Sequence, residues 1–88
     1  MWVFLDDVRN PPDDRWYVVR NYHDCINILM GANVEVISLD HDLGEEKTGY
    51  DVVKFMAEEN IWPSVVKVHS MNPVGRDNML SVINRYKP

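Results

Sequence analysis

The chain has 88 residues, of which 45% are hydrophobic and 26% charged, and its formal net charge is −5. This length allows one small domain, residues 1–88, and the composition is ordinary for a globular protein rather than a disordered one. The acidic balance argues against binding to duplex DNA or RNA, which requires a basic surface that releases counterions. A small phosphate ligand held by one or two arginines and a metal ion remains compatible with it.

Two features bear on the compartment of the protein. No apolar run approaches the ~18 residues of a membrane span, and the first residues show neither a basic region nor a small-residue cleavage site. The single cysteine, Cys25, has no intramolecular disulfide partner and fits a reducing environment. We therefore expect a cytoplasmic protein without a membrane partner.

The first apolar run, Trp2 to Leu5, is typical of a short strand, and Asp6 and Asp7 follow it directly. Where the chain turns at a strand end, two adjacent carboxylates can reach one cation; alternatively, one of them caps the turn. The prolines at positions 11 and 12 exclude an ordinary helix interior, so we expect a loop before the next strand.

A second strand is predicted for residues 16–20, and a helix follows it. Asn21 is a suitable N-cap residue with Asp24 three positions later, and Gly31 marks the helix end. The third strand, residues 34–39, is almost continuously apolar, as expected for a strand that is buried on both faces. It ends in three consecutive ionisable residues: Asp40, His41 and Asp42.

The second half of the chain predicts one more strand between two helices. Thr48 with Asp51 three residues on resembles a capping box, and that helix must end before Pro63. The fourth strand, residues 64–68, delivers His69 and Ser70 at its end. The pair Asn72-Pro73 then predicts the start of a last helix that runs to the end of the chain.

The order is strand, loop, strand, helix, strand, helix, strand, helix. Right-handed crossovers would make this a compact three-layer α/β domain with a parallel four-stranded sheet in the order 2-1-3-4. The carboxyl ends of parallel strands meet at one edge, which is where ligands bind in open α/β sheets. The residues expected together at that edge are Asp6, Asp7, Asp40, His41, Asp42, His69 and Ser70.

These residue types suggest a metal site combined with proton transfer. The four aspartates are hard oxygen ligands suited to Mg²⁺ or Mn²⁺. His41 and His69 could act as general base and general acid at a phosphorus centre, because histidine titrates near neutral pH. They could also be ligands, which would favour Mn²⁺, Fe²⁺ or Zn²⁺, or they could only hydrogen-bond the loops.

Two arginines could contact an anion at the same edge. Arg9 lies three residues after Asp6, so a local salt bridge is the other explanation for it. Arg76 falls near the first turn of the last helix, where the helix dipole disfavours a cation. It could contact an anion bound at that helix N-terminus, or it could be an ordinary solvated arginine.

The ends of these strands resemble the acidic pocket of response-regulator receiver domains. The resemblance rests on Asp6-Asp7 after the first strand, Asp40 after the third and Ser70 after the fourth. In that family the aspartates bind Mg²⁺, and the aspartate after the third strand accepts a phosphoryl group. This chain lacks the first helix and the fifth strand of that fold, and it adds His41 and His69.

A closer resemblance, over nearly the whole chain, is to the cyclic-phosphate processing receiver domains found in phages and bacteria. The matching motifs are Leu5-Asp6-Asp7-Val8-Arg9 with Pro11-Pro12, Ser38-Leu39-Asp40-His41-Asp42-Leu43-Gly44 with Thr48-Gly49-Tyr50-Asp51, and His69-Ser70-Met71-Asn72-Pro73-Val74-Gly75-Arg76-Asp77-Asn78-Met79. The resemblance implies a truncated receiver-like fold and, for a phage protein, the cytoplasm of a bacterial host.

The resemblance also implies a mechanism. A divalent metal, Mg²⁺ or Mn²⁺, would be held by Asp6, Asp7, Asp40 and Asp42, and the phosphate would be bound by Arg9, Ser70, Asn72 and Arg76. His41 and His69, with Asp40, would be the catalytic residues that open a cyclic phosphodiester, either the 2′,3′-cyclic phosphate of an RNA 3′ end or a cyclic nucleotide. The alternatives are a module that binds such a ligand or regulates a protein without turnover, and an interaction protein that forms a homodimer through its tryptophans.

Overall fold

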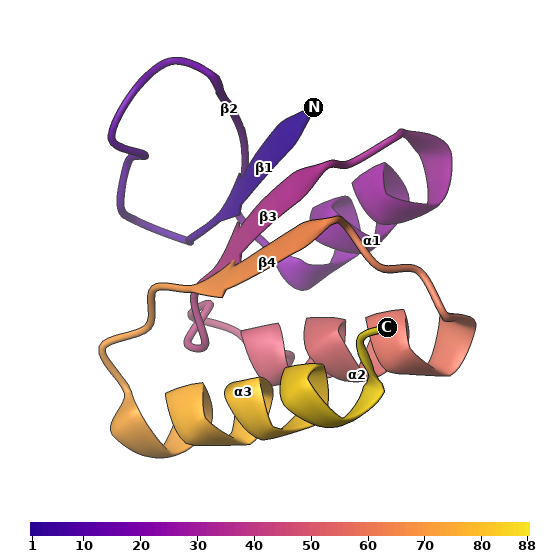
Figure 1. Ribbon diagram of the computed structural model, residues 1–88. Helices are drawn as coiled ribbons and strands as arrows, with labels where there is room; N and C mark the ends of the chain where they lie inside the picture. The colour runs from indigo at the N-terminus through magenta and orange to yellow at the C-terminus, as the bar shows by residue number, and fades with distance from the viewer.

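The computed structural model describes residues 1–88 and has four strands and three helices in the predicted order (Figure 1). The elements are β1 (Trp2–Leu5), β2 (Trp16–Val19), α1 (Tyr22–Gly31), β3 (Val36–Leu39), α2 (Gly49–Glu59), β4 (Val65–Val68) and α3 (Pro73–Tyr86). All strand pairs are parallel, and the strand order is β2-β1-β3-β4. The predicted α/β fold with sheet order 2-1-3-4 is confirmed.

The three helices begin at the caps that the sequence predicts. The side chain of Asn21 accepts a hydrogen bond from the backbone N–H of Asp24 at 2.9 Å, and Asn72 caps Gly75 at 3.0 Å. Before α2, the carboxylate of Asp51 accepts the N–H of Thr48 at 2.8 Å. Each cap satisfies a backbone donor that the first helical turn leaves unpaired, so the helix starts are encoded locally.

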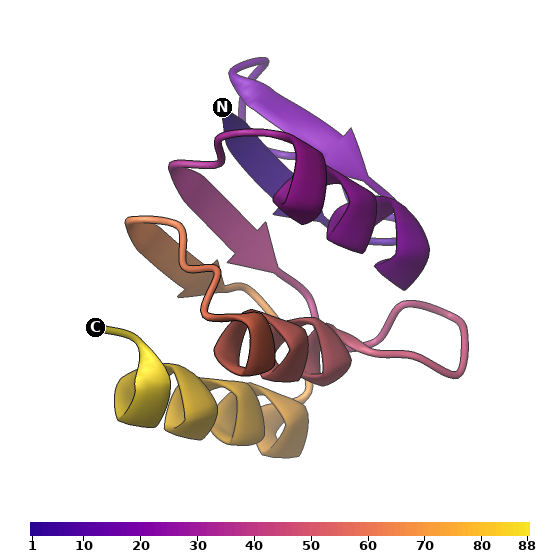
Figure 2. The same ribbon diagram turned by 90° about the vertical axis from the view of Figure 1, so that its right-hand side faces the viewer.

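The helices form a single layer on one face of the sheet. The connections through α1 and α2 both lead in the same direction across the sheet, and right-handed crossovers in one direction place their helices on the same face. Accordingly α1 packs against α2, and α2 packs against α3. Figure 2 shows the three helices side by side along the strands.

The opposite face of the sheet carries a loop and no helix. The connection from β1 to β2 is the only one that crosses the sheet in the direction opposite to the two helical connections, and it is the loop of residues 6–15. In Figure 1 this loop extends away from the helices. Arg15 of this loop stacks on Trp2, and Trp16 packs edge to face against Trp2 and Phe4. The predicted three-layer arrangement is therefore wrong: the helices form one layer, and this loop with the aromatic residues covers only part of the opposite face, where Val65 and Lys67 of β4 are exposed.

Alternation along the strands separates the two faces. The side chains of Val3, Leu5, Ile37 and Leu39 are fully buried under the helices, where they form one core with residues of all three helices. Their neighbours Phe4 and Ser38 point to the loop-covered face, since successive strand residues alternate between faces. None of the three helices has the length and apolar character that a bilayer crossing requires.

Candidate functional site

The first residue after each of three strands continues the hydrogen-bonded ladder of the sheet. The backbone N–H of Asp6 bonds to Val19, that of Asp40 to Leu5, and that of His69 to Leu39, at 2.9–3.2 Å. Asp6, Asp40 and His69 therefore lie in one row at the carboxyl edge of the sheet. The register of the parallel strands brings them together, as the sequence predicts.

Asp6 is fully buried, and four protein donors surround its carboxylate. One oxygen, Oδ1, accepts the backbone N–H groups of Val8 and Arg9 at 3.0 and 2.8 Å. The other, Oδ2, lies 3.0 Å from Nε of Arg9 and 3.1 Å from Nε2 of His69. A carboxylate offers about four acceptor positions, so this side chain is fully hydrogen-bonded.

His69 is held on every side of its ring. Its Nδ1 lies 2.7 Å from the hydroxyl of Ser38, its Nε2 contacts Asp6, and its ring stacks on Phe4 with centroids 4.3 Å apart. Burial lowers the pKa of His69 although Asp6 and Asp40 favour the protonated form, so the neutral ring prevails at neutral pH. Because the carboxylate of Asp6 only accepts, Nε2 carries the proton, and Nδ1 accepts from Ser38.

Opposite effects act on the pKa of Asp6. Burial alone would raise it, but the hydrogen bonds from the backbone of Arg9 and Val8 and from His69, with the charge of Arg9, outweigh burial and hold the pKa below its usual range. Asp6 is therefore ionised at neutral pH. We call Asp6, Arg9, Ser38, Asp40 and His69 the Asp6 group.

Asp40 is the member of the Asp6 group whose negative charge is least stabilised by its surroundings. Burial and the nearby charge of Asp6 raise its pKa, against the hydrogen bond from the N–H of His41 and the charges of Arg9 and His69. The guanidinium of Arg9 reaches Asp40 only at 3.6 Å. The ionised form of Asp40 therefore lowers the stability of the folded state. Its negative charge is also one that a cation bound beside Asp6 would neutralise.

The substitution Asp40→Asn should stabilise the fold at neutral pH. A carboxyl group whose pKa is raised by folding stabilises the protein fully below its ordinary pKa and loses this contribution as the pH rises. We expect a gain of about 0.5–2 kcal/mol in the free energy of unfolding near pH 7. The gain should vanish below about pH 3.8, the ordinary pKa of the group. Urea unfolding of the wild type and of Asp40→Asn, with chelator present, measures this gain. Equal free energies of unfolding near pH 7 would show that ionised Asp40 does not destabilise the fold.

Three carboxylates at this edge fit a divalent cation. Asp6, Asp7 and Asp40 each offer one oxygen, and the three oxygens lie within 4.8 Å of one another. These are hard donors suited to Mg²⁺ or Mn²⁺. Since Oδ2 of Asp6 already receives Arg9 and His69, an ion that uses it must replace one of these contacts.

His41 belongs to a second hydrogen-bonded group, next to the start of α3. Its Nδ1 lies 2.9 Å from Oδ1 of Asp42, and Oδ2 of Asp42 accepts from the amide of Asn72 at 3.3 Å. The hydrogen bond from His41 is the main reason why the pKa of Asp42 is low. His41, Asp42, Asn72 and Gly75 are the His41 group, and Asp42 lies outside the cluster of three carboxylates.

Gly75 makes room for the imidazole of His41. A Cβ atom at position 75 would lie 2.4 Å from Cγ of His41, closer than real Cβ contacts allow. At Gly31, in α1, an added Cβ meets nothing within 4 Å. The motif glycine in α3 is thus explained by the close packing of this one ring.

The substitution Gly75→Ala should lower the free energy of unfolding by about 1–3 kcal/mol, because the ring must leave its place. The control Gly31→Ala should leave stability unchanged or raise it by up to about 1 kcal/mol, since alanine favours the helix. Chemical denaturation of the two variants measures the difference. Equal effects would show that His41 does not need the space at Gly75.

The remaining predicted site residues have different surroundings. Asp7 is half-buried without a side-chain hydrogen bond, and Gly44, with φ +67°, passes close to it. Ser70 is buried, and its hydroxyl accepts the N–H of Asn72 at 3.1 Å. Arg76 is exposed in the first turns of α3, where its side chain is free to reach solvent or a ligand.

Two residues that the sequence analysis did not single out hold the site in place. Arg20 donates to the backbone oxygens of Asp6 and Arg9 and to the side chain of Asn10, so it fastens the loop that carries Arg9. Ser38 orients His69. A polar residue within a buried strand was the available sign for Ser38, because buried polar groups need partners.

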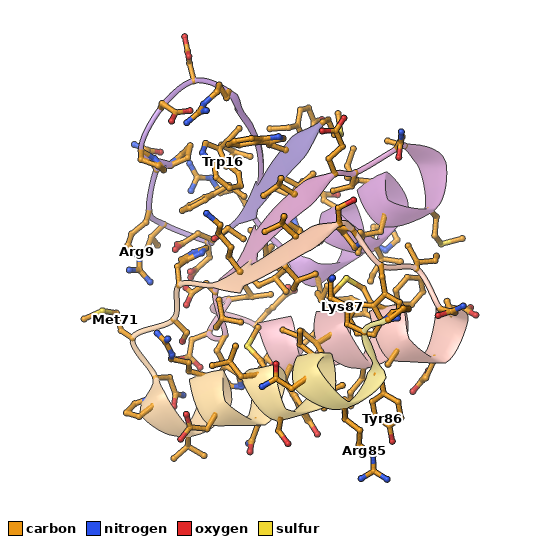
Figure 3. The ribbon with its side chains drawn as sticks, viewed as in Figure 1. Arg9, Trp16, Met71, Arg85, Tyr86 and Lys87 are labelled. Atoms are coloured by element: carbon orange, nitrogen blue, oxygen red, sulfur yellow. The ribbon has the colours of Figure 1, made fainter.

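No hollow in the surface lies over the carboxyl edge. The largest hollow in the surface, about 450 Å³, lies between α2 and α3, and neither it nor the smaller ones include a residue of the Asp6 or His41 groups. Figure 3 shows Arg9 and Met71 projecting outward at the end of the molecule where the strands finish. A ligand at this edge would therefore be bound on a surface and not enclosed.

Comparisons with known proteins identify the family. A family model described as the cyclic-phosphate processing receiver domain matches residues 1–85. Neither the curated proteins nor the solved structures contain a match to this chain. The matched segment includes all four strands, all three helices but the last residue of α3, and every residue of the Asp6 and His41 groups. The chain is therefore a member of the family of cyclic-phosphate processing receiver domains.

Proposed function

We propose that this chain hydrolyses a cyclic phosphodiester at the carboxyl edge of its sheet. The observation that carries the proposal is the row of Asp6, Asp40 and His69, with His41 directly beside Asp40. Together with Asp7, this row offers three carboxylates that could hold a cation beside two imidazoles, which is a suitable set for metal-assisted attack of water on phosphorus. The family description, which refers to cyclic phosphates, supports the choice of substrate.

The chemistry would divide between the metal and the chain. A divalent ion held by Asp6, Asp7 and Asp40 would neutralise charge on the phosphate. Arg9 and Arg76 would contact the phosphate oxygens. One histidine, as the neutral ring, would take the proton of the attacking water, and the other, only in its protonated imidazolium form, would give a proton to the departing sugar oxygen. One P–O bond to water forms, one ring P–O bond breaks, and a phosphate monoester with a free hydroxyl results.

The surroundings of the site suit a nucleotide. Val8, Met71 and Val74 are exposed apolar side chains on the two loops and the helix start that flank the carboxylates. Exposed apolar groups next to a polar site can contact a base or a sugar. None of the hollows in the surface encloses this edge, so the end of an RNA strand is as compatible with it as a mononucleotide.

A second candidate is a module that binds the same ligand without turnover. The full set of hydrogen bonds around Asp6 and His69 favours it, because these side chains are already satisfied without ligand. In this case Arg9, Arg76 and the start of α3 would hold the phosphate.

Phosphorus NMR separates the two candidates. The protein is incubated with 2′,3′-cyclic mononucleotides, an RNA with a 2′,3′-cyclic end and cyclic dinucleotides, in the presence of Mg²⁺, Mn²⁺ or chelator. New monoester resonances that disappear with chelator are the expected result. Broadened resonances of intact ligand would support the binding module, and unchanged spectra would contradict both candidates.

A further inference from the structure

We propose that Asp42 is a positioning residue, which together with Asn72 orients His41 so that its Nε2 atom accepts the proton of the attacking water. This inference rests on the proposed function, since it assigns the proton acceptor of that reaction. It removes Asp42 from the metal ligands and gives it a different task.

The hydrogen bond between Asp42 and His41 defines the tautomer of the ring. Oδ1 of Asp42 lies 2.9 Å from Nδ1 of His41. An ionised carboxylate only accepts hydrogen bonds, so Nδ1 of the neutral ring carries the hydrogen and Nε2 keeps its lone pair. Nε2 has no protein partner. The only fully buried side-chain polar atom without a partner is Nε1 of Trp16, so Nε2 of His41, in a side chain that is 17% exposed, keeps contact with solvent.

Asn72 orients the carboxylate of Asp42, which in turn is hydrogen-bonded to the imidazole of His41. Its Oδ1 caps α3 by accepting the N–H of Gly75 at 3.0 Å, which turns its Nδ2 toward Oδ2 of Asp42 at 3.3 Å. The side chain of Asp42 is 67% exposed, so without this contact little else would restrain it. A chain of hydrogen bonds therefore links the N-terminal cap of α3, through Asp42, to the imidazole of His41. Gly75 leaves the space that the ring occupies.

His69 has the opposite arrangement. Asp6 accepts from its Nε2 and Ser38 donates to its Nδ1, so both ring nitrogens are occupied and Nε2 carries the hydrogen. Of the two histidines only His41 offers a free lone pair to solvent. This difference assigns proton acceptance to His41.

The substitution Asp42→Asn tests the positioning role. The amide of Asn72 still needs an acceptor, so the carbonyl oxygen of the new side chain should take the place of Oδ2 and its NH₂ group should face Nδ1 of His41. A facing donor makes Nδ1 an acceptor and moves the ring hydrogen to Nε2. Nitrogen-15 NMR of the imidazoles near pH 8, where a free imidazole is neutral, reports this change directly.

We expect the tautomer of His41 to change from Nδ1–H in the wild type to Nε2–H in Asp42→Asn, and kcat to fall about 10–100-fold with KM nearly unchanged. Asp77→Asn is the matched control: it removes the same charge from an exposed position on α3 and should alter neither quantity. Asn72→Ser keeps a capping residue but shortens the donor, and it should give a mixture of tautomers.

Two results would overturn the inference: an Nε2–H tautomer of His41 already in the wild type, or an Asp42→Asn protein with unchanged tautomer and kcat. The NMR measurement needs no substrate. If the wild type turned over no cyclic phosphate but the tautomer changed as expected, the proposed function would fail while the role of Asp42 in orienting His41 would stand.

Discussion

The substitution Asp6→Ala should destabilise the protein by ~3–5 kcal/mol, because it removes a buried carboxylate that accepts four hydrogen bonds and leaves buried donors without a partner. The side chain is fully buried and accepts from two backbone N–H groups, from Arg9 and from His69. All four donors would lose this partner at once, and only the guanidinium of Arg9 would keep other contacts, to the backbone oxygen of His69 and to Asp40. A small domain has a free energy of unfolding of about 5–15 kcal/mol, so the loss would be a large part of the total.

Urea unfolding followed by tryptophan fluorescence measures this effect, with chelator present so that no metal contributes. The neighbouring Asp7→Ala is the control, because Asp7 is half-buried and makes no side-chain hydrogen bond. It should change stability by no more than about 0.5 kcal/mol, or raise it slightly by removing negative charge near Asp40. A stable Asp6→Ala protein would show that the hydrogen bonds around Asp6 do not hold the loop.

The substitution His41→Gln should lower turnover of the cyclic phosphate by about 10²–10⁴-fold, the usual contribution of a residue that transfers a proton in the transition state. Glutamine can keep a hydrogen bond to Asp42, but it has no lone pair basic enough to take a proton from water. Ligand binding should be retained, since the carboxylates and Arg9 lie in the Asp6 group.

His23→Gln is the matched control for this loss. His23 is exposed on the first turn of α1 and makes no hydrogen bond or ion pair, so the variant should keep wild-type turnover. Circular dichroism should show both variants folded, because the space beside Gly75 accepts the smaller glutamine side chain. Turnover of His41→Gln within threefold of the wild type would exclude His41 as the proton acceptor.

The fold was predictable because its determinants are local. Short apolar runs define the four strands, and Asn21, Thr48 with Asp51, and Asn72 define the helix starts; the structure confirms them. The three-layer prediction was wrong, although the predicted loop and strand order together already imply that the helices lie on one face. Layer composition depends on which connection runs backwards across the sheet, and the only one that does lacks a helix.

The convergence of the strand-end residues was also predictable, because parallel strands end at a common edge. Their division into two groups was not. Asp40 and His41 are adjacent in sequence, yet Asp40 lies with Asp6 while His41 lies against α3. The direction of a side chain beyond a strand end depends on the following turn and on the neighbours that accept it, and neither is encoded in the spacing of residues.

The supporting contacts were the least visible in the sequence. Arg20 fastens the loop through backbone oxygens, which any residue can offer, so no sequence pattern indicates its partners. Asp42 resembles one more metal ligand until its two hydrogen bonds are seen. A residue that positions another is recognised by the hydrogen-bond distances between them, and these distances are known only from the structure.

The most direct test of the account is hydrolysis of 2′,3′-cyclic mononucleotides and of an RNA with a 2′,3′-cyclic end in water enriched in oxygen-18, followed by phosphorus NMR. We predict a monoester that carries one oxygen-18 atom on phosphorus, formed with Mg²⁺ or Mn²⁺ and not with chelator, because in the proposed mechanism water attacks phosphorus at the carboxylate edge. Intact substrate under every metal condition, or a monoester with the label in the sugar hydroxyl, would contradict this account.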